Sequence, residues 1–104
     1  MKAKLREDYR YVRFKIISEK EYTKQEFEKN LRQALARILG ELGYAKCLPR
    51  LLYYGSGQGI VKILRDGEKE TRAALALVAK FDSNPIHLQT VFVSGTIKGC
   101  KSKK

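Results

Sequence analysis

Basic side chains recur at positions from which they could share one surface, and phosphate binding is the chemistry that they favour. Arg13 and Lys15 alternate with apolar residues early in the chain, and Lys62 and Arg65 flank apolar residues in the middle. The chain then finishes on four lysines with no acidic neighbour: Lys98, Lys101, Lys103 and Lys104. Lys and Arg side chains that neutralise phosphates release condensed counterions, so the set indicates a nucleic-acid partner. For any one of these residues, an ordinary solvated charge is an equally good interpretation.

The overall charge points the same way. The 104 residues include 22 Lys and Arg against 11 Asp and Glu, a formal net charge of +11. Charge of this size destabilises a compact fold by self-repulsion, so it usually accompanies an anionic partner. An anionic membrane is the competing partner, but the longest apolar run, residues 73–79, is far shorter than the roughly 20 residues of a membrane span.

Nothing in the sequence indicates secretion. The N-terminus is basic but lacks the apolar segment of a signal peptide. Cys47 and Cys100 have neither the spacing of a disulfide framework nor that of a zinc site. We therefore expect a cytoplasmic protein.

The residues that could support catalysis or bind a cofactor have simpler interpretations. Gly55, Gly57 and Gly59 resemble a phosphate loop, but a strand follows them where such a loop requires a helix. His87 has no nucleophile or carboxylate near it in sequence, and Cys100 is more simply a small structural residue. The acidic residues sit at helix starts and beside lysines. We expect no catalytic residue, no metal site and no cofactor in this chain.

The elements that position the basic residues follow from periodicity. Residues 9–18 alternate as a strand with one apolar face and one basic, aromatic face. Thr23 and Glu26 form a capping box, and an apolar stripe follows it at helical spacing: Phe27, Leu31, Leu35, Ile38 and Leu42. Gly43 is expected to end this helix in the left-handed conformation.

The second half is predicted to contain three strands and a helix. Pro49 interrupts the apolar run 46–54, which favours an edge strand or a bulge. A hairpin loop at 55–57 leads into a strand over 58–65, a helix from Glu68 to about Lys80, and a last strand over 86–94. Gly95 is expected to bend the chain, and a basic tail begins at about Lys98.

This order, βαββαβ, predicts one α+β domain over residues 1–104. We expect a ferredoxin-like sandwich, RRM-like in shape, with four antiparallel strands and both helices on one face. The first and third strands are central neighbours in that fold, which would bring Arg13 and Lys15 beside Lys62 and Arg65. Residues 58–65 contain no aromatic side chain for base stacking, although Tyr11 on the neighbouring strand could stack. Ile60 and Leu64 indicate that protein covers part of the open face, either the chain's own terminus or a partner.

With its elements in this order, the chain resembles the protein component 2 family of archaeal ribonuclease P, which has a eukaryotic counterpart. The resemblance rests on four segments: Arg10-Tyr11-Val12-Arg13-Phe14-Lys15-Ile16, Leu39-Gly40-Glu41-Leu42-Gly43, Arg72-Ala73-Ala74-Leu75-Ala76-Leu77 and Val93-Ser94-Gly95-Thr96-Ile97-Lys98. It implies a subunit of the ribonucleoprotein that removes the 5′ leader of precursor tRNA, in which the RNA is the catalyst.

The resemblance also implies partners. They are the ribonuclease P RNA, the component 3 protein subunit and, indirectly, precursor tRNA, with Mg²⁺ held on the RNA of the holoenzyme. A homodimer within the complex is an open alternative. The expected RNA-binding residues are Tyr11, Arg13, Lys15, Lys62, Arg65, Lys98, Lys101 and Lys103.

Two other functions stay open at this point. The chain could be a stand-alone RNA-binding domain of RRM-like shape. It could also be a ferredoxin-like sensor of small anions, or a small enzyme such as an acylphosphatase, with its ligand at residues 55–59. The last interpretation leaves most of the +11 charge unexplained.

Overall fold

The protein was analysed as a computed structural model that describes residues 8–102. In chain order its elements are β1 (Tyr9–Ser18), α1 (Lys24–Cys47), β2 (Arg50–Gly55), β3 (Gln58–Leu64), the 3₁₀ turn η1 (Arg65–Gly67), α2 (Glu68–Leu77), β4 (Lys80–Phe81), β5 (Asn84–Ser94) and α3 (Ile97–Ser102). The strands form one antiparallel sheet in the order β2-β3-β1-β5-β4. No helix among the described residues is long and apolar enough to cross a membrane.

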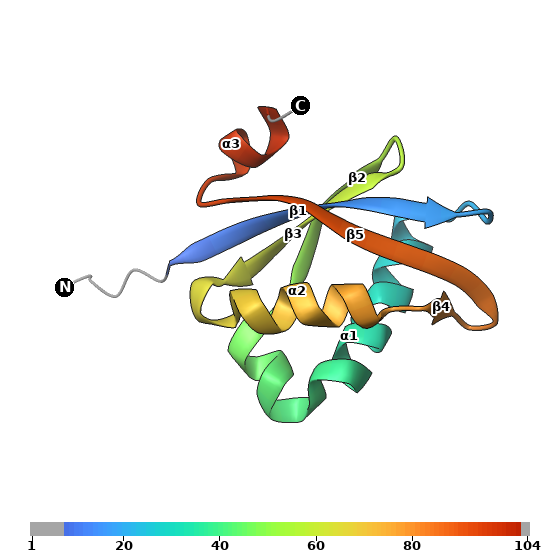
Figure 1. The fold of residues 1–104 in the computed structure, drawn as a ribbon, viewed down its shortest axis with the longest axis horizontal. Coiled ribbons are helices and arrows are strands. Elements are labelled where there is room, and N and C mark those ends of the chain that lie inside the picture. The colour runs from blue at the N-terminus through green and yellow to red at the C-terminus, as the bar shows by residue number, and fades with distance from the viewer. Residues whose placement is uncertain (1–7, 103–104) are drawn as a thin grey trace.

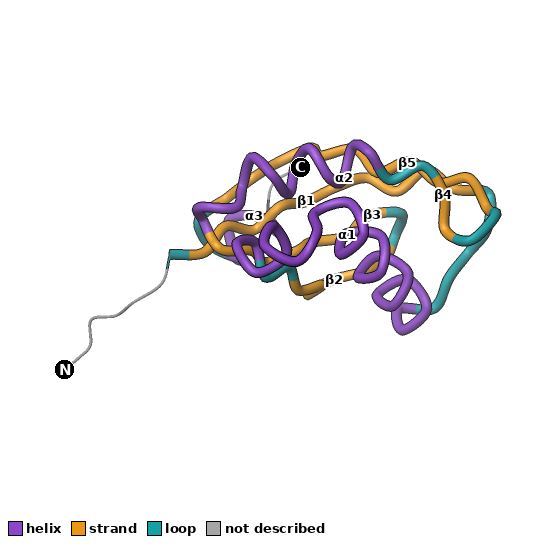
Figure 2. Tube along the Cα trace, turned by 90° about the horizontal axis from the view of Figure 1, so that it is seen from below, coloured by secondary structure: helices purple, strands orange, loops and turns teal. Residues whose placement is uncertain are grey.

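Helices cover both faces of the sheet. The long helices α1 and α2 lie together under one face, whereas the short α3 lies against the other (Figure 1). Figure 2, seen from the side of the long helices, shows both of them in front of the strands. The α+β sandwich and the central pairing of β1 with β3 were predicted, but the sheet has five strands rather than four. The extra strand is the two-residue β4, which pairs with the start of β5.

The core lies between the sheet and the two long helices. Alternation along β1 turns Val12 and Phe14 into it, where they are fully buried. From α1, Phe27 and Leu35 fill the space below them, with the Phe14 and Phe27 rings stacked at 6.1 Å between centroids. Gly59 packs directly against this cluster. A Cβ at position 59 would come within 2.6 Å of the Phe14 ring, so a larger residue would not fit there. The glycines at 55–59 therefore form the hairpin and allow it to pack against the core. A hairpin rather than a phosphate loop is the interpretation that the sequence favoured.

The first helix begins as predicted but continues further. The Thr23 side chain accepts from the Glu26 amide, and the Glu26 carboxylate accepts from the Thr23 amide, both at 3.1 Å. The expected left-handed stop at Gly43 is wrong. Gly40 takes φ +76° and kinks the helix, which then continues to Cys47. Because the kink changes the phase of the apolar stripe, Leu42 is not in the core and is 88% exposed.

The second helix is shorter than predicted. It ends at Leu77 instead of about Lys80, and Val78 is already extended. Leu77, the last helical residue, is 66% exposed. Phe81 is still buried, but it reaches the core from β4, where Lys80 and Phe81 pair with Pro85 and Asn84. Strand pairing with β5 thus replaces the last helical turn.

Edge strand β2 follows Pro49, in agreement with the edge position that proline favours. It joins β3 through Ser56 and Gly57, which both have positive φ, as two-residue hairpin turns require. Its register with β3 shifts between Leu51 and Tyr53. This bulge decides which side chains of β2 face α3.

Candidate nucleic-acid interface

The face of the sheet opposite α1 and α2, called the open face below, carries a cross-strand row centred on Arg13. Tyr53 of β2 pairs with Ile60 of β3, Ile60 pairs with Arg13 of β1, and Arg13 pairs with Phe92 of β5. Side chains in such a row have Cβ atoms roughly 5 Å apart, so they contact one another. Strands β1 and β3 are neighbours as predicted, but Arg13 pairs with Ile60 and Lys15 pairs with Gln58 rather than with Lys62 or Arg65.

Helix α3 lies over the middle of this face and is anchored by Cys100. The Cys100 side chain is fully buried, and its Sγ donates to the Tyr11 carbonyl at 3.5 Å. The Arg13 Nη1 donates to the Cys100 carbonyl at 3.3 Å, and the Arg13 Nε donates to Gln58 Oε1 at 2.7 Å. Burial raises the pKa of the Cys100 thiol, an effect that the nearby Arg13 charge opposes. The thiol is therefore protonated and structural at neutral pH.

This contact answers the expectation that protein covers part of the open face. Ile60 points toward that face, yet it is only 2% exposed. Over β1 and β5, the cover is the chain's own helix α3. The segment after β5 is thus not a simple extended tail: the chain bends at Gly95, the Thr96 Oγ1 accepts from the Gly99 amide at 3.0 Å, and α3 folds back onto β1 and β5.

The structure brings some of the predicted RNA-binding residues together. Arg13 of β1 and Lys101 of α3 line one cavity, and Lys98 is exposed on α3. Lys15 is exposed beside Gln58 and Gln89 of the neighbouring strands. These cations lie on or above the open face.

Lys62 and Tyr11 lie at the next cross-strand row, and Arg65 lies apart. Lys62 pairs with Tyr11, which is half-buried next to α3, and the Lys62 Nζ is 4.0 Å from the centre of the Tyr9 ring. Arg65, in η1, forms an ion pair with Asp8 at 3.2 Å and is not part of the cluster. Lys103 and Lys104 lie outside the described residues.

Sequence reasoning missed Tyr53. Its ring is on the open face at the outer strand, 39% exposed, with the Lys101 Nζ 5.8 Å from the ring centre. A cavity of about 340 Å³ lies between the β2–β3 hairpin and α3, and we call it the hairpin pocket. Its lining is Arg13, Tyr53, Gly55, Ser56, Gln58, Ile60 and Lys101. Within residues 8–102, no acidic side chain lines it.

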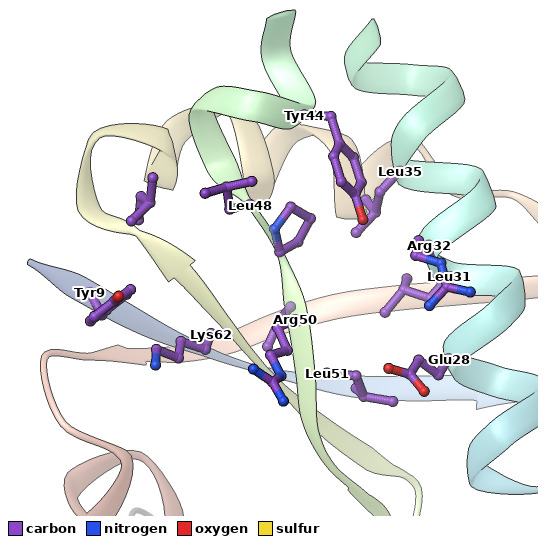
Figure 3. A pocket seen from close by; sticks show the side chains of 13 residues that line it. Tyr9, Glu28, Leu31, Arg32, Leu35, Tyr44, Leu48, Arg50, Leu51 and Lys62 are labelled. Atoms are coloured by element: carbon purple, nitrogen blue, oxygen red, sulfur yellow. The ribbon is translucent and has the colours of Figure 1, made fainter. Parts of the chain in front are cut away.

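A second cavity, of about 440 Å³, lies between α1 and β2 and is called the α1–β2 groove. In Figure 3, Leu31 and Leu35 of α1 lie across the groove from Leu51 of β2, with Tyr44 near one end. Its rim is mostly basic, with Arg32, Arg50 and Lys62 against a single acid, Glu28.

Leu48 stands at this rim in an unfavourable conformation. It is 53% exposed and has φ 43° and ψ 58°, a left-handed conformation that bulky side chains rarely adopt. An exposed leucine held in this way adds apolar surface to the groove.

Among the described residues, no group of three or more His, Cys, Asp or Glu side chains could hold a metal ion. His87 is exposed on β5 opposite Ile17, and Cys47 is buried with its Sγ donating to the Gly67 carbonyl at 3.4 Å. The two cavities present cationic and apolar side chains.

Comparisons with known proteins agree with the sequence resemblance. The model of the Rpp14/Pop5 family matches residues 10–104. The protein named ribonuclease P protein component 2 of Pyrococcus abyssi is 40% identical over 95% of this chain and 86% of its own length. The protein of the same name from Methanocaldococcus jannaschii is 35% identical over 95% of this chain and 74% of its own length.

A solved structure shares the fold. A chain in the cryo-EM structure of yeast ribonuclease MRP superposes with a TM-score of 0.62 over 90% of this chain and 79% of that chain, at 10% identity. This chain belongs to the Rpp14/Pop5 family, together with the archaeal proteins named ribonuclease P protein component 2.

Proposed function

We propose that this chain is a non-catalytic subunit of ribonuclease P, which supports the catalytic RNA in removing the 5′ leader of precursor tRNA. Family membership supports the assignment to this ribonucleoprotein. The observation that carries the RNA-binding role is the cationic open face, where Arg13 and Lys101 meet at an acid-free cavity and Lys98 is exposed beside them.

Phosphate contacts explain how such a subunit helps an RNA catalyst. Folded RNA brings phosphate backbones close together, and Mg²⁺ on the RNA relieves their repulsion. Lys and Arg side chains that bind phosphates supply positive charge at the same places and release counterions. In this proposal, the lysines of α3 and the cations of β1 and β3 substitute for part of the Mg²⁺, and the chain itself holds no cofactor.

The second part of the proposal is assembly with the component 3 subunit through the α1–β2 groove. Its aliphatic floor, formed by Leu31, Leu35 and Leu51, suits large apolar side chains of a protein. Leu48 at the rim would become buried on docking, which would offset its unfavourable conformation. The excess of basic rim residues favours a partner segment that carries acidic side chains next to its apolar ones.

Cleavage of precursor tRNA at graded Mg²⁺ concentrations tests the function. Cognate ribonuclease P RNA is assayed with component 3 alone and with component 3 plus this chain. We expect the chain to lower the Mg²⁺ concentration needed for half-maximal cleavage. Equal Mg²⁺ dependence with and without the chain would reject the proposed role.

A further inference from the structure

The hairpin pocket combines an aromatic ring, an apolar floor and two cations. Tyr53 and Arg13 occupy the two sides of Ile60 in one cross-strand row, so the ring and the guanidinium flank a common floor. Lys101 reaches the same space from α3, with its Nζ 5.8 Å from the centre of the Tyr53 ring. Residues from β1, from the β2–β3 hairpin and from α3 thus converge although they are distant in sequence.

The neutral polar groups of the pocket can form hydrogen bonds with a ligand held between the ring and the cations. The Ser56 hydroxyl can both donate and accept, and the Gln58 carboxamide still presents its NH₂ group because its oxygen accepts from Arg13. The described residues that line the pocket carry positive charge from Arg13 and Lys101 and include no acidic side chain. A ligand for this pocket should therefore be anionic at one end and flat and partly apolar at the other.

We propose that the hairpin pocket binds one unpaired nucleotide of RNA. The base lies against the Tyr53 ring, and its phosphate contacts Lys101 and Arg13. This inference rests on the RNA-binding role proposed above and adds a base-stacking site to it. The cavity, at about 340 Å³, has the size of a small-molecule site rather than of a site for a bare phosphate.

The position of the site differs from that of an RNA recognition motif, whose stacking aromatics include the third-strand motif. Here α3 covers the middle of the sheet, and the corresponding position on β3 is occupied by the buried Ile60. In the proposed site the stacking ring is instead on the outer strand β2, beside the cavity between the hairpin and α3. Stacking on an aromatic ring tolerates any base, because every base has a π face. We therefore expect little sequence preference.

Substitution of Tyr53 separates stacking from charge. Binding of a short fluorescein-labelled oligouridylate to the full chain is followed by fluorescence anisotropy at several salt concentrations. Tyr53→Ala should weaken binding by about 5- to 150-fold without changing the salt dependence, since no charge is lost. Tyr53→Phe keeps the ring and should bind within about twofold of wild type. Lys101→Ala should instead lower the log-log salt slope by about one.

The outcomes distinguish this inference from the proposed function. If Tyr53→Ala binds as wild type while Lys101→Ala is weaker, the stacking site is wrong and phosphate binding stands. If Tyr53→Phe loses as much affinity as Tyr53→Ala, the hydroxyl rather than the ring is responsible and the stacking site is also wrong. If wild type does not bind oligouridylate, the pocket proposal fails, and the Mg²⁺ assay decides the ribonuclease P role separately.

Photocrosslinking provides a test without substitutions. An oligouridylate that carries 4-thiouridine is crosslinked to the wild-type chain, which is then digested with trypsin. We expect the crosslinked residue, located by tandem mass spectrometry, to be Tyr53 in the tryptic peptide of residues 51–62. A crosslink confined to α1 peptides would place the base in the α1–β2 groove and overturn the proposal.

Discussion

The α1–β2 groove and the hairpin pocket lie along the same edge strand, β2, but their linings are chemically different. The groove has an aliphatic floor of residues that belong to the main core, such as Leu35 and Leu51. The pocket has a single aliphatic floor residue, Ile60, and otherwise presents an aromatic ring, cations and neutral polar groups. The groove also contains an acid, Glu28, whereas the part of the chain that the structure describes contributes none to the pocket.

This difference indicates how one small domain can bind two kinds of partner. Apolar surface continuous with a core is typical of a protein interface, and its affinity depends on burying a few large side chains. Cations around an aromatic ring are typical of single-stranded nucleic-acid sites. Variants on the two sides of β2 should therefore affect different partners.

The largest expected effect comes from Leu48→Gly. Glycine adopts the left-handed conformation of residue 48 readily, so the free energy of unfolding should be unchanged or higher by up to about 1 kcal/mol. Because the exposed Leu48 side chain is lost from the rim, we expect at least about tenfold weaker binding of component 3, measured by calorimetry. RNA affinity should not change.

The matched control is Leu77→Ala, which removes an exposed leucine from α2, outside both cavities. It should leave component 3 binding unchanged. If Leu48→Gly binds component 3 as wild type does, the groove is not the docking site. If it weakens RNA binding instead, the assignment of partners to the two sides is reversed.

A smaller effect is expected from raising the pH, and it should act on the pocket side. Burial raises the pKa of Cys100 above its ordinary value of 9.0. The unfolded chain then loses the thiol proton at lower pH than the folded chain. The stabilisation of the folded state by the buried, protonated thiol is complete below about pH 9, and it is lost as the pH rises through the folded-state pKa of Cys100. As the thiolate forms, α3 should loosen from β1.

Denaturant unfolding from about pH 8 to about pH 10.5 measures this, with Cys100→Ala as the comparison. Lysines and tyrosines titrate in both proteins, so the difference between them isolates the thiol. We expect wild type to lose more stability than Cys100→Ala over this range. Parallel curves would show that the Cys100 proton does not hold α3 in place.

The parts of the fold that were predicted depend on local patterns. The alternation of β1, the capping box of Thr23 and Glu26 and the β2–β3 hairpin each need only neighbouring residues. The sequence did not distinguish a kink at Gly40 from a helix end at Gly43, because either glycine can adopt the left-handed conformation that both features use. Helix α3 has six residues, too few for a periodic signal, and its position depends on contacts of Cys100 with β1.

The candidate site likewise has one part that the sequence predicted and another that it did not. The topology predicted that β1 and β3 are neighbours, but it did not give the register, which places Ile60 rather than Lys62 or Arg65 opposite Arg13. Tyr53 did not follow, because residues two apart in a regular strand share a face, and Leu51 faces the core. The bulge between Leu51 and Tyr53 turns the tyrosine to the open face instead. A one-residue bulge of this kind leaves no clear mark in the sequence.

The most direct test of the account is the salt dependence of RNA binding by a Lys98→Ala, Lys101→Ala double variant. Its control is Lys69→Ala with Lys80→Ala, which removes the same charge from exposed positions on α2 and β4. Affinity for the ribonuclease P RNA is measured over a range of salt concentrations. If the open face with α3 contacts phosphates, the first variant should bind more weakly and its log-log slope should fall by about 1–2, with less change in the control. An unchanged slope, or an equal fall in the control, would contradict the assignment of RNA binding to this face.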